Sequence, residues 1–129
     1  MKYGLIGKTL KHSYSKIIHQ QFFGYDYELI ELDSLDEFFL KKDFCGINVT
    51  FPYKEDVIKF CDKLDSSAIE VGCVNVITNR NGFLTGYNTD YFGLKFTFEK
   101  NNIDILGKKA LILGSGGTSK TASCVLKNC

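Results

Sequence analysis

Residues 46–54 read Gly-Ile-Asn-Val-Thr-Phe-Pro-Tyr-Lys, and this stretch decides the fold class. Its first four residues combine β-branched Ile and Val after a glycine, which is typical of a short buried strand. Pro52 suits the first turn of a helix, where its missing N–H leaves no hydrogen bond unmade. The stretch therefore predicts a strand followed by a helix, with one apolar helix face made of Val57, Phe60, Cys61 and Leu64.

Short apolar runs alternate with helical patterns on both sides of this stretch. Further strands are expected at residues 3–6, 27–32, 74–78 and 83–85, and helices at 15–23, 34–42 and 89–100. Asn81-Gly82 is a strong hairpin signal between the last two strands. This order predicts an α/β fold with three layers, in which helices cover both faces of a mixed, mostly parallel sheet.

The last part of the sequence predicts a second structural unit. Residues 109–113 (Lys-Ala-Leu-Ile-Leu) are expected to form a buried strand, and a glycine-rich loop then leads into a final helix. A strand, glycine loop and helix in this order open a Rossmann-like domain. One strand and one helix cannot bury both faces of a sheet. We therefore expect residues 1–104 to form one domain, and residues 105–129 to be only the beginning of a truncated second one.

Composition and charge argue against several classes of protein. The 129 residues include 44% apolar side chains, enough for one ordinary core, and the net charge is +1. Such a balance gives no electrostatic basis for binding nucleic acid or an anionic membrane. No apolar run could span a bilayer, and the N-terminus does not resemble a signal peptide. We therefore expect a cytoplasmic protein without nucleic-acid or membrane partners.

The cysteines and histidines do not form a metal-binding pattern. The five cysteines are an odd number without a CxxC pair, so free thiols in a reducing compartment are expected. His12 and His19 are too far apart for one helix turn. We therefore expect no metal site.

Polar residues gather where strands meet helices. Ser13 and Ser15, two residues apart at a helix start, can both face one carboxylate, although either could simply cap the helix. Asn48 and Thr50 lie at the end of a strand, where open α/β sheets bind their ligands, and Lys54 lies on the helix expected next. An amide, a hydroxyl and an ammonium group suit a small polyhydroxylated molecule, although an exposed lysine beside a solvated helix start is the alternative.

Two further polar residues have both a structural and a functional interpretation. Asn75 lies in an otherwise apolar strand, where its amide could bind a ligand or form a structural hydrogen bond. Asp90 lies in the first turn of a helix that Asn88 or Thr89 could cap, which is ordinary for an acidic residue.

The glycine loop predicts a dinucleotide site. Its residues are Gly114, Ser115, Gly116, Gly117, Thr118 and Ser119, with Ser119 where the third glycine of the motif usually falls. The residue about 20 positions later, which distinguishes NAD from NADP, would lie beyond Cys129. The residues therefore leave the choice of cofactor open.

Taken in order, these motifs resemble the shikimate dehydrogenase family. The family pattern is GxPIxHSxSPxxHN, GxNVTxPxK, GAVNT, GxNTDxxG and GxGGA. This sequence has GKTLKHSYSKIIHQ, GINVTFPYK, GCVNV, GYNTDYFG and GSGGTS, so the resemblance covers nearly the whole chain. The second and fourth motifs match fully. Departures occur at Thr9, Lys16, Gln20, Val76 and Thr118.

The resemblance implies a function and a role for each residue. Family members reversibly reduce 3-dehydroshikimate to shikimate with NADPH, in aromatic amino acid biosynthesis. Ser13 and Ser15 would hold the shikimate carboxylate, and Lys54 with Asp90 would be the catalytic pair. The ring hydroxyls would be bound by Asn48, Thr50, Asn75 and Asp90. Whether Lys54 removes the hydroxyl proton or only orients and polarises the hydroxyl stays open.

Two alternatives accompany this interpretation. The isolated chain could bind shikimate without catalysing anything, which is what we expect of these 129 residues by themselves. The complete enzyme could instead act on quinate or another ring acid. Uncovered apolar faces also lead us to expect that the chain self-associates, as a homo-oligomer.

Overall fold

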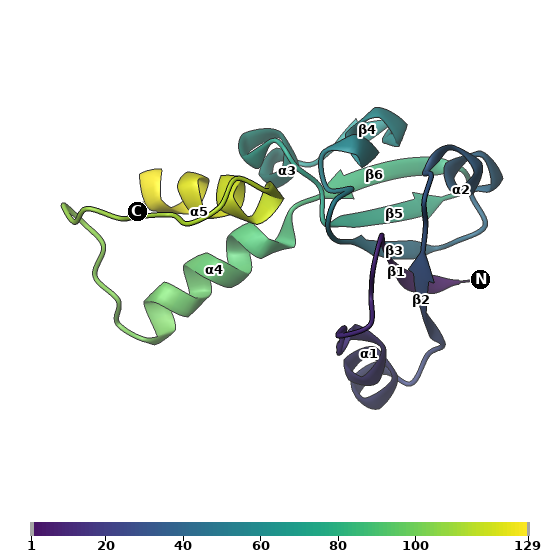
Figure 1. The fold of residues 1–129 in the computed structure, drawn as a ribbon, viewed down its shortest axis with the longest axis horizontal. Helices are drawn as coiled ribbons and strands as arrows, with labels where there is room; N and C mark the ends of the chain where they lie inside the picture. The colour runs from purple at the N-terminus through teal and green to yellow at the C-terminus, as the bar shows by residue number, and fades with distance from the viewer. Residues whose placement is uncertain (1, 129) are drawn as a thin grey trace.

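The computed structural model describes residues 2–128, and its six strands form one mixed sheet in the order β2-β1-β3-β5-β6-β4 (Figure 1). The pairs β1/β2, β1/β3 and β4/β6 are parallel, whereas β3/β5 and β5/β6 are antiparallel. This confirms a mixed, mostly parallel sheet. The strands are β1 (Tyr3–Gly7), β2 (Tyr27–Glu31), β3 (Gly46–Val49), β4 (Lys63–Leu64), β5 (Val76–Arg80) and β6 (Phe83–Tyr87).

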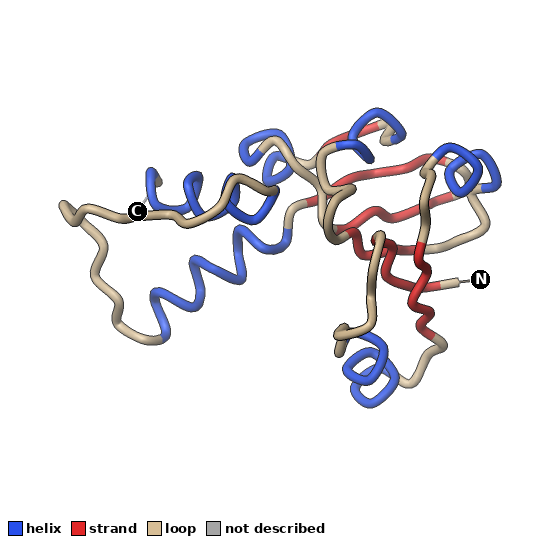
Figure 2. The backbone as a smooth tube through the Cα atoms, viewed as in Figure 1, coloured by secondary structure: helices blue, strands red, loops and turns tan. Residues whose placement is uncertain are grey.

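Helices cover both faces of this sheet, as expected. The helices are α1 (Ser15–Phe23), α2 (Asp36–Lys41), α3 (Ser66–Val71), α4 (Thr89–Lys100) and α5 (Gly117–Lys127). Helix α1 packs beside β1 and β2 on one face, and α2 lies on the other (Figure 1). Figure 2 shows α4 extending away from the sheet, with α5 beside it.

The two faces of the sheet have separate cores, because successive residues of a strand point to opposite sides. Ile6 belongs to the larger core, with Ile47 of β3 and Phe39 of α2. Leu5, its neighbour in β1, instead joins the smaller cluster around Tyr27. The register places Leu5 beside Asn48 of β3, so Asn48 lies on this second face as well.

The prediction of a helix that starts near Pro52 and extends to Leu64 is wrong. The chain forms turns there, followed only by the short 3-10 helix η1 (Asp56–Phe60). Leu64, expected on the helix face, lies instead in β4 beside β6. The backbone N–H of Asp62 donates to the Leu84 carbonyl at 2.9 Å. Long-range pairing therefore takes the backbone groups that a continued helix would use internally.

The buried strand expected at residues 109–113 is also wrong. This segment has no regular structure, and Leu111 and Leu113 are 84% and 89% exposed. A strand needs a neighbouring strand to receive its backbone hydrogen bonds. Within residues 2–128 none pairs with this segment. The helix that follows forms without it, because its hydrogen bonds are internal.

Three features of the described residues bear on the earlier expectations. On α4, Tyr91, Leu94 and Phe98 are half-buried whereas most other residues of the helix are exposed, which confirms the expected inner side of this helix. Cys45, Cys61, Cys73 and Cys124 are free thiols, whereas Cys129 lies outside the described residues. Within residues 2–128, the helices are too short or too polar to cross a membrane.

Candidate functional site

One cleft of about 440 Å³ brings together all seven side chains predicted to bind the substrate. These residues are Ser13, Ser15, Asn48, Thr50, Lys54, Asn75 and Asp90. The cleft lies where the parallel strands β1 and β3 end, next to the starts of α1 and α4. Open α/β sheets bind ligands at this edge, and the volume is in the range of small-molecule sites.

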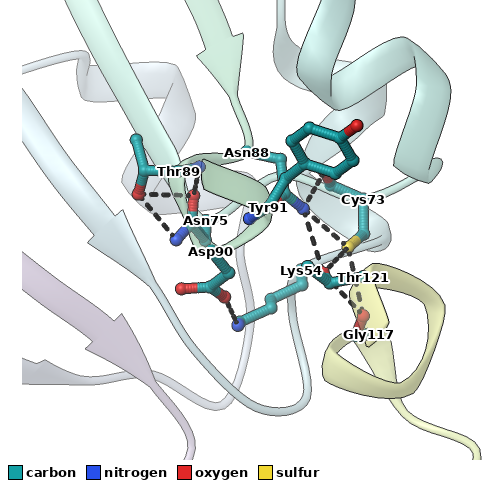
Figure 3. Close-up of polar contacts among 9 residues, drawn as sticks. All are labelled: Lys54, Cys73, Asn75, Asn88, Thr89, Asp90, Tyr91, Gly117 and Thr121. Carbon is teal, nitrogen blue, oxygen red and sulfur yellow. Dashed lines mark hydrogen bonds and ion pairs between the residues drawn. The ribbon is translucent and has the colours of Figure 1, made fainter. Parts of the chain in front are cut away.

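Lys54 and Asp90 form an ion pair across this cleft. The Lys54 ammonium donates to the Asp90 carboxylate at 2.5 Å, although 36 residues separate the two (Figure 3). The Lys54 side chain is only 14% exposed, so water screens the pair less than a surface pair. An ammonium group and a carboxylate in contact can together bind a hydroxyl and accept or return its proton.

Asn75 has the structural role foreseen as one of its two alternatives. It lies just before β5 rather than inside a strand, and it is 7% exposed. Its Oδ1 accepts the Thr89 backbone N–H at 2.8 Å, and its Nδ2 donates to the Thr89 hydroxyl at 3.0 Å. Asn75 therefore holds the start of α4, the turn that carries Asp90, while still lining the cleft.

The serine pair contributes polar groups to the opposite side of the cleft. The Ser13 hydroxyl accepts the Ser15 backbone N–H at 3.2 Å, so it shapes the turn before α1 and keeps its own proton for a ligand. The cap of α1 makes no side-chain hydrogen bond. Lys11 and Lys54 outnumber the one lining carboxylate, Asp90, so the cleft favours an anionic ligand.

Two aromatic residues of this region were missed by the sequence analysis. Tyr27 is 2% exposed and donates its hydroxyl to Asn48 Oδ1 at 2.6 Å. His19 lines the cleft and stacks on the Tyr27 ring, with centroids 4.1 Å apart. Burial lowers the pKa of His19 below its ordinary 6.5 and raises the pKa of Tyr27 well above 10.0. Strand alternation could have placed Tyr27 on a buried face. Its hydrogen bond to Asn48, however, reaches from one strand past a second to a third, which no local pattern predicts.

A buried polar cluster joins α5 to the cleft wall (Figure 3). Asn88 is fully buried, caps α4 by accepting the Tyr91 N–H at 3.1 Å, and donates to the Cys73 carbonyl at 3.0 Å. Its Nδ2 also lies 3.4 Å from the Thr121 hydroxyl on α5. Burial raises the pKa of the Cys73 thiol, which donates to the Gly117 carbonyl at 3.4 Å.

The glycine loop borders a second cavity of about 310 Å³, which shares Thr50 and Lys54 with the cleft. Five of the six predicted loop residues line it, all except Ser115. Gly116 caps α5 without a side-chain hydrogen bond and its carbonyl accepts the Ser119 N–H, so the Gly117 and Thr118 N–H groups remain available for an anion. A Cβ at Gly114 or Gly116 would meet no atom within 4 Å. These features fit a phosphate group of a dinucleotide.

A larger cavity of about 540 Å³ lies between β1, β2 and α2. It contains none of the seven residues predicted to bind the substrate, and carboxylates outnumber lysines in its lining. No motif converges there, so the smaller cleft around Lys54 is the better candidate for chemistry.

Comparisons of the sequence with known proteins all identify one family. Residues 5–77 match the family model described as "Shikimate dehydrogenase substrate binding domain". The shikimate dehydrogenase (NADP(+)) of Caldicellulosiruptor bescii is 40% identical over 128 residues, which cover 90% of this chain and 44% of that protein. The enzyme of the same name from Halothermothrix orenii is 41% identical, over 95% of this chain and 46% of that protein. The chain thus spans about half the length of these relatives.

Solved structures agree with these sequence relationships. The crystal structure of shikimate dehydrogenase 1 from Peptoclostridium difficile superposes with a TM-score of 0.91 at 40% identity, over 99% of this chain and 52% of that one. The Thermus thermophilus enzyme in complex with NADP(H) and shikimate has a TM-score of 0.83 at 26% identity, again over 99% and 52%. The α/β fold class is therefore confirmed.

Proposed function

This chain belongs to the family of shikimate dehydrogenase substrate-binding domains, and on that premise we propose that it is the substrate-binding part of an NADP-dependent shikimate dehydrogenase. One observation carries the proposal. The seven side chains predicted to bind the substrate come from four separate segments and meet in a single cleft around the Lys54–Asp90 ion pair. We propose that residues 1–104 form the substrate domain and that residues 105–129 begin the nucleotide domain.

The proposed substrate is shikimate, and its product is 3-dehydroshikimate. The Ser13 and Ser15 hydroxyls hold its carboxylate beside the start of α1, where the helix dipole favours an anion. Asn48 and Thr50 bind ring hydroxyls from the end of β3. Asn75 and Asp90 complete the set from the other side of the cleft.

The chemistry proposed for Lys54 and Asp90 concerns one proton. Oxidation of a carbinol removes a hydride from carbon while the hydroxyl proton leaves, so that a carbonyl forms. The NADP nicotinamide, when bound, accepts the hydride. Lys54 contacts the reacting hydroxyl. Asp90 fixes the lysine ammonium and accepts hydrogen bonds from the ring hydroxyls. In the reverse direction the pair supplies the proton to the carbonyl oxygen.

The loop from Gly114 to Ser119 is proposed to hold the phosphates of NADP at the start of α5. Its cavity shares Thr50 and Lys54 with the substrate cleft, so cofactor and substrate would bind on neighbouring surfaces. The proposal for NADP over NAD follows the relatives' names, because the discriminating position is not among the residues described.

The test is an assay of the complete polypeptide of which these residues form part. Purified enzyme is incubated with shikimate or quinate, each with NADP or NAD, and formation of reduced nicotinamide is followed. The proposal predicts turnover with shikimate and NADP that exceeds the other three combinations. Preference for quinate would assign a different ring acid to the site, and no turnover with any combination would refute the proposal.

A further inference from the structure

The Tyr27 side chain reaches across the sheet to a residue of the substrate cleft. Tyr27 lies in β2 and Asn48 in β3, with β1 between them. The register places both on the face that also holds Leu5. The phenol donates to Asn48 Oδ1 at 2.6 Å, while Tyr27 itself is 2% exposed. This bond is therefore shielded from water and, by its length, a strong one.

The bond fixes which end of the Asn48 amide is available to a ligand. An amide has one accepting oxygen and one NH₂ donor. The phenol binds the oxygen and holds it toward Tyr27, whereas among residues 2–128 no hydrogen-bond partner is found for the Asn48 NH₂ group. Asn48 lines the cleft, so the NH₂ group is what it can offer there. Burial raises the pKa of Tyr27, so the phenol keeps the proton that it donates.

The Tyr27 ring is itself held in place. His19 of α1 stacks on it, with an interplanar angle of 10° and centroids 4.1 Å apart. The His19 Nδ1 is hydrogen-bonded to the Tyr25 hydroxyl at 2.6 Å. Helix α1 and the turn before β2 therefore hold the ring from which the phenol reaches Asn48.

We propose that Tyr27 is a positioning residue that turns Asn48 into a pure hydrogen-bond donor toward the cleft. The ligand atom opposite Asn48 must then be an acceptor, namely a hydroxyl, carbonyl or carboxylate oxygen. A ligand that presents only an N–H group or an apolar group there would leave the Asn48 NH₂ group unpaired in the complex and would bind more weakly. This inference deepens the proposed function and rests on it for the identity of the ligand.

The positioning is tested without ligand, by NMR of the chain labelled with ¹³C and ¹⁵N. We expect Tyr27→Phe to shift the Asn48 side-chain carbonyl carbon, because its hydrogen bond is lost. Tyr53→Phe is the matched control: Tyr53 is also buried and donates its hydroxyl to the Leu32 carbonyl, outside the cleft. An unmoved Asn48 resonance in folded Tyr27→Phe would overturn the inference.

The unmutated chain gives a second measurement that does not depend on a variant's folding. A phenol that is 2% exposed and bonded to an amide should show a resolved hydroxyl proton that exchanges slowly with water. Rapid exchange of this proton would also overturn the inference.

The functional consequence is tested by titrating shikimate into four chains: unmutated, Tyr27→Phe, Asn48→Ala and the double variant. Loss of positioning should weaken binding roughly 3- to 10-fold, the size of one hydrogen bond. In the Asn48→Ala background the same change should alter affinity by less than about 2-fold. Equal losses in both backgrounds would show a merely structural role for Tyr27. No binding to the unmutated chain would count against the proposed function, and the two NMR measurements would still decide the positioning.

Discussion

Gly117 packs directly against the side chain of Lys54. A Cβ on Gly117 would lie 3.1 Å from Lys54 Cβ and 3.2 Å from Lys54 Cδ, closer than side chains normally approach. The glycine therefore allows the first turn of α5 to lie on the wall of the substrate cleft. Because this glycine belongs to the loop proposed for the cofactor, the two proposed binding sites meet at Lys54.

Replacement of Gly117 by Ala should loosen this contact. Gly93→Ala is the matched control, because Gly93 lies within α4 and a Cβ there would meet no atom within 4 Å. Urea unfolding should show that Gly93→Ala gains about 0.5–1 kcal/mol, as expected for a helix interior. Gly117→Ala should show no such gain, and alkylation of buried Cys73 should become faster as α5 moves away. Equal gains and equal labelling rates would contradict the contact.

Asn88→Ala should destabilise the chain more than the loss of an ordinary helix cap. The change removes the α4 cap and leaves the buried Cys73 carbonyl without its donor, so we expect a loss of about 2–4 kcal/mol in the free energy of unfolding. Asp65→Ala removes only the cap of α3 and its bond to the Ser67 hydroxyl, and should cost about 1 kcal/mol. Similar losses for the two variants would argue against the cluster.

Lys54→Met tests whether the lysine acts in the chemical step. In the complete enzyme we expect kcat to fall roughly 10²- to 10⁴-fold with little change in KM. Lys59→Met is the control, because Lys59 is exposed and pairs only with Asp36 at 3.9 Å. Steady-state kinetics measures both parameters. A change confined to KM would mean that Lys54 only binds the substrate.

The folded chain should resist protonation of His19. Burial lowers the pKa of His19 below 6.5, so the unfolded chain takes up this proton first as the pH falls. The free energy of unfolding should therefore decrease from about pH 6.5 down to the folded-state pKa and be unaffected by this group at higher pH. NMR titration of the His19 ring should give a midpoint below 6.5. A midpoint at or above 6.5 would contradict the effect of burial.

Local sequence signals were sufficient for the elements whose hydrogen bonds are internal or that lie in the centre of the sheet. The expected bounds of α1, α4 and β3 agree with the structure. By contrast, β4 depends on pairing with β6, which no local pattern reveals. Helix α3 was missed, although Asp65 as its cap and Gly72 at its end are ordinary signals. The strand expected at residues 109–113 failed because hydrophobicity alone does not supply a pairing partner.

The candidate site followed from the sequence to the extent that it consists of motif residues at strand ends and helix starts. Ser13, Asn48 and Asp90 lie in one cleft as expected, because β1, β3 and β6 run in the same direction and end at one edge of the sheet. The contacts of Tyr27 with Asn48 and of Gly117 with Lys54 could not be foreseen. Both depend on how separate elements pack, which spacing along the chain does not encode.

Calorimetric titration of shikimate into the chain is the most direct test of the proposal that the cleft around Lys54 binds shikimate. We predict saturable binding that is tighter for shikimate than for quinate and that is weakened in Ser13→Ala and Asp90→Ala. Circular dichroism of each variant would establish that it is folded. Binding that persists unchanged in both variants, or the absence of saturable heat from the folded unmutated chain with either acid, would contradict the claim.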